Sequence, residues 1–201
     1  GNVILKLLYS HIGFYINGLR SVQKDEKYGF IDSEGKEVIP CEYEWTAGYF
    51  IGNKVLAKRE TYFIMDRQGN VVRNLDYSWV IEHRFNKDWL LASSNGKEGI
   101  IDFKGDIILP FEYEEIKSIP DTELLKVRQN KLYGLLDKNL NYVIPPVYTY
   151  MEDSFHEGLC RVGKEYLYGF INPKGEEVIP ISYVKFTTDV PFKNGITCLQ
   201  D

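Results

Sequence analysis

The segment that decides the fold of this chain is Tyr28-Gly-Phe-Ile-Asp-Ser-Glu-Gly-Lys-Glu-Val-Ile-Pro40. It recurs as Glu98-Gly-Ile-Ile-Asp-Phe-Lys-Gly-Asp-Ile-Ile-Leu-Pro110 and again as Tyr168-Gly-Phe-Ile-Asn-Pro-Lys-Gly-Glu-Glu-Val-Ile-Pro180. Looser copies run from 62 to 74 and from 132 to 145. Self-similarity at a fixed period is the signature of a repeat architecture. The sequence therefore predicts a tandem array.

The looser copies depart from the pattern at identifiable positions. In the second copy Phe63 replaces the glycine and Asn74 replaces the proline, while in the fourth copy Leu140 replaces the turn glycine. A tyrosine follows three residues after the proline position in every copy, with spacings of 34, 36, 35 and 35 residues; these tyrosines are Tyr43, Tyr77, Tyr113, Tyr148 and Tyr183. A residue that recurs once per repeat is expected to pack in the core, with its hydroxyl bonded to a polar partner.

Each repeat is predicted to form three antiparallel strands. The first has the pattern Gly-Leu-x-x-Val, the second is the Tyr-Gly-Phe-Ile segment, and the third is Glu-Val-Ile-Pro. Asp-x-x-Gly between the second and third strands is typical of a type I turn, in which aspartate accepts a backbone N–H and glycine takes a positive φ. No helical periodicity of useful length is present. We expect an all-β fold of tandem three-stranded antiparallel meanders of about 35 residues, arranged as an open superhelical array.

The alternative arrangement is a closed β-propeller. Residues 1–12 align with residues 105–116, and residues 194–199 resemble the first strand of a repeat, so the chain begins and ends within a repeat. In a propeller these two ends would complete one blade. We otherwise expect them to be joined to further repeats of a longer protein.

The composition excludes several classes of protein. The chain has 201 residues, 44% of them hydrophobic and 26% charged, as in ordinary globular domains. Its net charge of −5 argues against non-specific nucleic-acid binding, which depends on a basic surface. No apolar stretch is long enough to span a membrane. The three cysteines, at 41, 160 and 198, do not form a zinc-binding pattern.

The repeat resembles the WG (or KWG) repeat family of bacterial proteins, and the resemblance extends over essentially the whole chain. It rests on the aromatic-Gly-Phe-Ile-Asp, x-x-Gly, x-x-Val-Ile-Pro and following Tyr positions. The chain departs from the family at the usual tryptophan position, which holds Tyr28, Tyr62, Glu98, Tyr133 and Tyr168. The resemblance implies one WG-repeat domain over residues 1–201, in a bacterial protein that serves interaction. It implies no catalytic residues and does not distinguish a cytoplasmic protein from an envelope or secreted one.

Residues that the repeat does not require are the better candidates for function. Trp79, His83, Arg84 and Trp89 lie within eleven residues, after the degenerate second copy. Tryptophan and arginine dominate binding hot spots because they combine large contact area with a polar group. Trp45 is a similar outlier. The competing interpretation is that Trp79 and Trp89 fill space left by Phe63 and Asn74.

No set of residues indicates chemistry. The histidines fall at different phases of the repeat, and the aspartates of the Asp-x-x-Gly turns are explained by the turns. We therefore predict no catalytic residues, no metal and no cofactor. The expected function is a non-catalytic scaffold that binds a protein partner. The alternative is a carbohydrate-binding module of a cell-envelope protein, and a hydrolase is the least favoured class.

Overall fold

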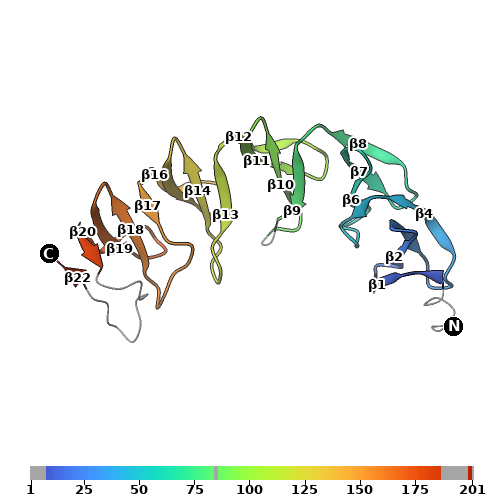
Figure 1. Cartoon of the computed structure of the whole chain (residues 1–201), viewed down its shortest axis with the longest axis horizontal. Coiled ribbons are helices and arrows are strands. Elements are labelled where there is room, and N and C mark those ends of the chain that lie inside the picture. Colours follow the sequence, from blue (N-terminus) through green and yellow to red (C-terminus); the bar gives the residue numbers. More distant parts are fainter. Residues whose placement is uncertain (1–7, 84–85, 187–198, 201) are drawn as a thin grey trace. The chain divides into compact units, whose positions relative to one another are not determined.

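The computed structural model describes residues 8–83, 86–186 and 199–200, and these residues form successive antiparallel sheets (Figure 1). The first sheet contains β1 (His11–Ile16), β2 (Leu19–Lys24), β3 (Lys27–Ile31) and β4 (Glu37–Tyr43). The second contains β5 (Trp45–Thr46), β6 (Lys54–Lys58), β7 (Tyr62–Asp66) and β8 (Val71–Leu75). The third contains β9 (Trp79–Glu82), β10 (Trp89–Ser94), β11 (Lys97–Asp102) and β12 (Ile107–Tyr113).

The remaining sheets continue the same order along the chain. The fourth contains β13 (Glu115–Ser118), β14 (Leu125–Gln129), β15 (Leu132–Leu136) and β16 (Tyr142–Tyr148). The fifth contains β17 (Tyr150–Met151), β18 (Cys160–Lys164), β19 (Leu167–Ile171) and β20 (Glu177–Tyr183). A pair formed by β21 (Lys185–Phe186) and β22 (Leu199–Gln200) follows. Each sheet is open, so the all-β tandem array is confirmed.

Each four-stranded sheet has one strand more than the predicted meander. Two residues after each repeat tyrosine the chain starts a short strand that pairs in the next sheet. Thus β4 ends at Tyr43, and β5 begins at Trp45 and pairs with β6. In the second repeat β8 already ends at Leu75, before Tyr77. Apart from β1, which has six residues, these extra strands have two to four residues and are too short for their alternation to be recognised in the sequence. The sequence pattern therefore could not reveal this fourth strand.

The Asp-x-x-Gly segments form the predicted turns. Asp32 Oδ1 accepts the N–H groups of Glu34 and Lys36, both at 2.9 Å, and the Gly35 N–H bonds the Asp32 carbonyl at 3.3 Å. Gly35 has φ of 85°. In the fourth repeat Leu140 takes φ of 64° at the same turn position, where a side chain is strained. The turn aspartates thus have a structural role.

The glycine of the Tyr-Gly-Phe-Ile strand lets the third strand approach closely. A Cβ on Gly29 would lie 2.5 Å from the Ile39 carbonyl oxygen. The register shifts there, with Tyr28 opposite Tyr43 but Phe30 opposite Ile39, which is the bulge that glycine permits.

In the second repeat the glycine position holds Phe63, and the pairing around it is regular. Phe63 lies opposite Asn74, and Tyr62 lies opposite Leu75. The two departures that the sequence shows in this repeat therefore face each other across one ladder.

The chain divides into two compact units, residues 1–95 with 100–108 and residues 96–99 with 109–201. In the first, a core between the first two sheets includes Phe30, Ile39, Tyr43, Val55 and Phe63. In the second, a core between the fourth and fifth sheets includes Leu135, Ile144, Tyr148, Val162 and Ile171. That the whole chain acts as one domain stays a prediction.

Three of the five repeat tyrosines pack in the core as predicted, whereas Tyr77 and Tyr183 are partly exposed. Tyr43, Tyr113 and Tyr148 are each no more than 4% exposed. The Tyr113 hydroxyl lies 2.9 Å from the Tyr142 hydroxyl. Burial, together with this hydrogen bond, raises the pKa of Tyr113 above its ordinary value. These three buried tyrosines therefore belong to the core.

Successive repeats also contact each other through the turn glycine. A Cβ on Gly69 would lie 3.6 Å from the Ile39 side chain of the preceding repeat, and one on Gly175 would lie 2.7 Å from that of Ile144. At Gly105 the neighbouring side chain of the preceding repeat is Arg73, and a Cβ on Gly105 would lie 2.8 Å from Arg73 Cγ. The glycine thus serves both the turn and the contact with the previous repeat.

The alternative of a closed propeller blade concerns residues 1–12 and 194–199. Of these, residues 1–7 and 194–198 lie outside the described residues, and Leu199 pairs with Phe186 of β21. Across the part of the chain that the structure describes, no helix has the length and apolarity that crossing a membrane requires.

Candidate functional site

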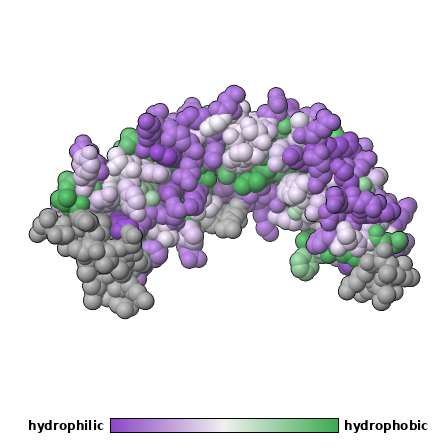
Figure 2. Space-filling view, viewed as in Figure 1, coloured by the Kyte–Doolittle hydropathy of each residue, from purple (hydrophilic) through white to green (hydrophobic). Residues whose placement is uncertain are grey.

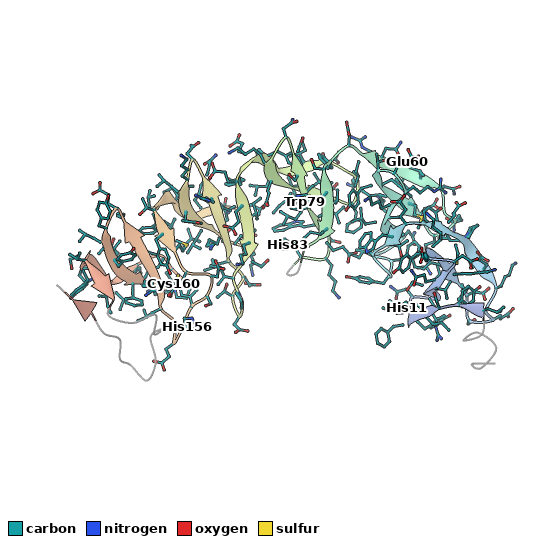
Figure 3. All side chains as sticks on the ribbon, viewed as in Figure 1. His11, Glu60, Trp79, His83, His156 and Cys160 are labelled. Carbon is teal, nitrogen blue, oxygen red and sulfur yellow. The ribbon has the colours of Figure 1, made fainter. Side chains whose placement is uncertain are left out.

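The predicted cluster lies on the hairpin of β9 and β10. Trp79 opens β9 and lies opposite Ser93, Ile81 lies opposite Leu91, and Trp89 opens β10. Arg84, the fourth predicted residue, lies outside the described residues. Figure 3 shows Trp79 and His83 near opposite ends of β9. The hairpin therefore separates Trp79 from His83 and Trp89.

The hairpin has a buried face and a face of partly exposed side chains. Side chains alternate along a strand, so Val80 and the opposing Ala92 share one face, and both are almost fully buried. Trp79 and Ile81 share the other face, where Ile81 is 50% exposed and Trp79 is half-buried. A hydrophobic area is visible over the middle of the chain, around β9 and β10 (Figure 2). The side chains of Trp79 and Ile81 are not among the buried residues of the core.

His83 holds the loop end of the hairpin together. Its backbone N–H donates to the Trp89 carbonyl at 3.0 Å, and its ring meets the Trp89 ring edge-on with centroids 5.5 Å apart. The Asn86 N–H donates to His83 Nδ1 at 3.4 Å. His83 is only 7% exposed. The structure thus brings His83 and Trp89 together, in a packed rather than open arrangement.

Burial lowers the pKa of His83 below 6.5. Between that lowered value and 6.5 the unfolded chain binds more protons than the folded one, so stability falls as the pH drops through this window and then levels off. We expect His83→Gln to remove this dependence. Thermal unfolding of both proteins from pH 7.5 to pH 5 checks it, since the difference between them cancels the opposite contribution of Glu82. A difference that is flat with pH would contradict the burial of a neutral imidazole.

Glu82, next to His83, is also partly buried. Burial raises its pKa, and the nearby Tyr49 hydroxyl opposes that shift. Tyr49 belongs to the segment between β5 and β6, so this interaction joins the second sheet to β9 within the first unit.

Trp45 and Trp79 occupy the same position of successive repeats. Each is the second residue after its repeat tyrosine, each opens the short edge strand of its sheet, and they are 34 residues apart, as are Tyr43 and Tyr77. Trp45 lies opposite Lys58 and is 37% exposed. The spacing alone could have revealed this equivalence.

A hollow of about 400 Å³ lies near the turn between β1 and β2. Three separate segments line it, with the side chains of Ile16, Asn17, Tyr49, Phe50, Ile51 and Lys87. Phe14, on the adjacent strand, is 87% exposed. Of its two aromatic residues, Tyr49 is partly exposed and Phe50 is buried in the core of the first unit, and Lys87 adds one ammonium group. No single stretch of sequence signals it, because the fold brings its parts together.

The described residues contain no group of three or more His, Cys, Asp or Glu side chains that could hold a metal ion. The absence of a metal, a cofactor and a catalytic set stays a prediction. Cys160 is buried, and burial raises the pKa of its thiol to about 12, so at neutral pH it is a packing residue rather than a nucleophile. Cys198 lies outside the described residues.

The repeated sheets agree with the comparison to known families. The chain matches the WG containing repeat over residues 1–28, 28–59, 99–133, 133–168 and 168–198. It belongs to the WG repeat family. The matched ranges leave out residues 60–98, and that segment of the WG-repeat chain holds Phe63, Asn74, Trp79 and Trp89. Four candidate residues, Trp79, His83, Arg84 and Trp89, therefore lie where this member departs from its family pattern, whereas Trp45 lies within a matched repeat.

Similarity to individual proteins is remote. No curated protein matched the chain. A crystal structure of the eukaryotic initiation factor is 10% identical with a TM-score of 0.49, and the match covers 85% of this chain and 52% of that one. Kluyveromyces lactis Hsv2 is 10% identical with a TM-score of 0.40, covering 80% and 59%. The chain thus spans little more than half the length of these structures, and such likeness says nothing of its function.

Proposed function

We propose that this WG-repeat chain is a non-catalytic scaffold that binds a protein partner through its tryptophan-bearing edge strands, β5 and β9. The observation that carries the proposal is the recurrence of Trp45 and Trp79 at one position of successive sheets, with Trp45 37% exposed. A large aromatic side chain at a partly solvated strand end adds contact area at low entropic cost, which is typical of an interface anchor.

The residues around these two tryptophans are suited to binding the surface of another protein. Ile81, two residues from Trp79 on the same face of β9, is 50% exposed and extends the apolar area. Lys58 lies opposite Trp45 and supplies a charged neighbour. An apolar centre with a polar surround is the usual anatomy of a protein interface.

The test is affinity capture from lysate and envelope fractions with the wild-type chain and with Trp45→Ala/Trp79→Ala. We expect a partner whose recovery falls about tenfold with the double variant. Tyr166→Ala is the matched control, because Tyr166 is an aromatic residue 82% exposed in a different repeat. Equal recovery by the double variant, with its unfolding temperature close to that of the wild type, would remove the tryptophans from the interface.

The competing proposal, a carbohydrate-binding module, is supported by the hollow beside the partly exposed Tyr49. An aromatic ring next to a hollow is suited to stacking on a sugar ring. Calorimetric titration with cell-wall and plant polysaccharides distinguishes the two proposals. Saturable binding that is lost in Tyr49→Ala favours the glycan, and no heat with any polysaccharide counts against it.

A further inference from the structure

The third strand of each sheet lies at a sheet edge, and in most repeats a proline interrupts it. Prolines stand at the same position in β4, β12, β16 and β20; they are Pro40, Pro110, Pro145 and Pro180. Proline cannot donate to a ladder and is a common device against unwanted edge pairing. In β8 the position is taken by Asn74. Among these third strands, β8 is therefore the one that lacks a proline to block edge pairing.

The hydrogen-bond pattern shows where the Asn74 N–H points. The carbonyls of Leu56 and Lys58 accept from the β5 side, from Ala47 N at 2.9 Å and Glu44 N at 2.9 Å. The backbone N–H and C=O of the intervening Ala57 therefore point toward β7, where Ala57 lies opposite Phe63.

The same alternation continues one strand outward. The backbone N–H and C=O of Phe63 point toward β6, so those of its neighbour Ile64 point toward β8. There Ile64 lies opposite Arg73. The next residue, Asn74, then directs its N–H and C=O away from the sheet. Proline at this position removes that outward donor, whereas Asn74 retains it.

The side chains of β8 are accessible and carry a charge opposite to that of the neighbouring repeats' strands. Val71 and Val72 are 49% and 47% exposed, and Arg73 and Asn74 are also exposed. The corresponding strands carry acids, such as Glu37 in β4 and Glu177 in β20, or no charge. In the described part of the chain Arg73 takes part in no ion pair of 4 Å or less. The edge is apolar and basic.

We propose that β8 binds an extended segment of a partner protein, with aliphatic and acidic residues in alternation, as an added strand at the outer edge of the second sheet. The added strand bonds the outward N–H and C=O of Asn74, as in other cases of strand addition. Its aliphatic side chains pack on Val71 and Val72, and a carboxylate meets Arg73. A second copy that paired through its own β8 is less suited, because that strand contains no acidic residue to meet Arg73.

This inference rests on the proposed function as a protein-binding scaffold, but it uses a surface distinct from the tryptophans. The probe is a labelled, end-capped peptide, Ser-Val-Glu-Val-Glu-Val-Ser, followed by fluorescence anisotropy with the full chain. We expect saturable binding that weakens about tenfold in Asn74→Pro and changes little in Asn74→Ala, which keeps the backbone N–H. The other repeats accommodate proline at this position, and thermal unfolding verifies the fold of each variant.

Two further measurements keep the proposal testable if Asn74→Pro does not fold. A peptide in which lysine replaces glutamate is expected to bind about tenfold more weakly to the wild type, and Arg73→Glu is expected to reverse that preference. N-methylation of the central peptide valine is expected to abolish binding, because it removes a ladder donor.

Three results would overturn the proposal. They are the absence of saturable peptide binding, equal binding by a folded Asn74→Pro variant, and self-association of the wild type that Asn74→Pro abolishes, which would make a second copy the occupant. Trp45→Ala/Trp79→Ala is expected to bind the peptide as the wild type does. Failure of the peptide test therefore leaves the tryptophan capture result standing, and the two proposals fail separately.

Discussion

Gly29→Ala is expected to lower the free energy of unfolding of the first unit by about 3 kcal/mol, one of the two largest effects that we expect from a single substitution. The new Cβ would lie 2.5 Å from the Ile39 carbonyl oxygen and 2.8 Å from Cys41 N. Both neighbours are backbone atoms of β4, so neither can move without breaking the ladder between β3 and β4. Urea unfolding of the wild type and the variant measures the loss.

The matched control for this substitution is Gly52→Ala. Gly52 has φ of 58°, but a Cβ there meets nothing within 4 Å. The control therefore pays only for the backbone conformation, about 1 kcal/mol. If Gly29→Ala costs no more than Gly52→Ala, the close approach of the two strands is wrong.

Phe30→Ala is expected to cost about 3 to 5 kcal/mol, as is usual when a buried phenylalanine is truncated. Phe30 is 1% exposed, and its ring meets Phe50 edge-on with centroids 4.9 Å apart. Phe30 belongs to β3, whereas Phe50 lies between β5 and β6, so this contact joins two successive repeats. The same urea titration measures the loss.

Phe14→Ala provides the control, because Phe14 is the same residue type, in the same unit, and 87% exposed. We expect it to change the free energy of unfolding by less than about 0.5 kcal/mol. Similar losses for Phe14→Ala and Phe30→Ala would mean that the repeats do not share the core described above.

The parts of the fold that depend on one repeat were predictable from the sequence. The turn at Asp32 and Gly35, the close approach at Gly29 and the burial of Tyr43 each follow from a residue type with one strong conformational or packing preference. Recurrence at a fixed spacing made each preference visible several times in one chain. The break at Glu98, by contrast, depends on the next sheet, since its carboxylate accepts the N–H of Ile116 in β13 at 2.6 Å.

The parts that depend on contacts between repeats were not predictable. The strand that follows each repeat tyrosine has only two to four residues, which is too short for a periodic signal. This strand pairs in the next sheet rather than with the strand before it. The burial of His83 depends on Trp89 across the hairpin, and the hollow near Tyr49 needs three segments. By contrast, the equivalence of Trp45 and Trp79 was available from their spacing of 34 residues.

The second repeat shows how one copy can change in sequence while its four-stranded sheet is kept. Phe63 and Asn74 lie opposite each other in the ladder of β7 and β8, where the other repeats have glycine and proline. Phe63 is 4% exposed and contributes to the core of the first unit. The same pair of changes is accompanied by regular pairing from Tyr62 to Ile64 and leaves a donor on the outer edge.

The most direct test of this edge is amide hydrogen exchange by NMR, first on the free chain and then with the acidic peptide. Asn74 is expected to exchange quickly in the free chain, while Arg73 and Leu75, which are directed to β7, exchange slowly. Addition of the peptide should slow the exchange of Asn74 and leave Arg73 and Leu75 unchanged. Slow exchange of Asn74 in the free chain, or no change when the peptide saturates, would contradict an open edge at β8.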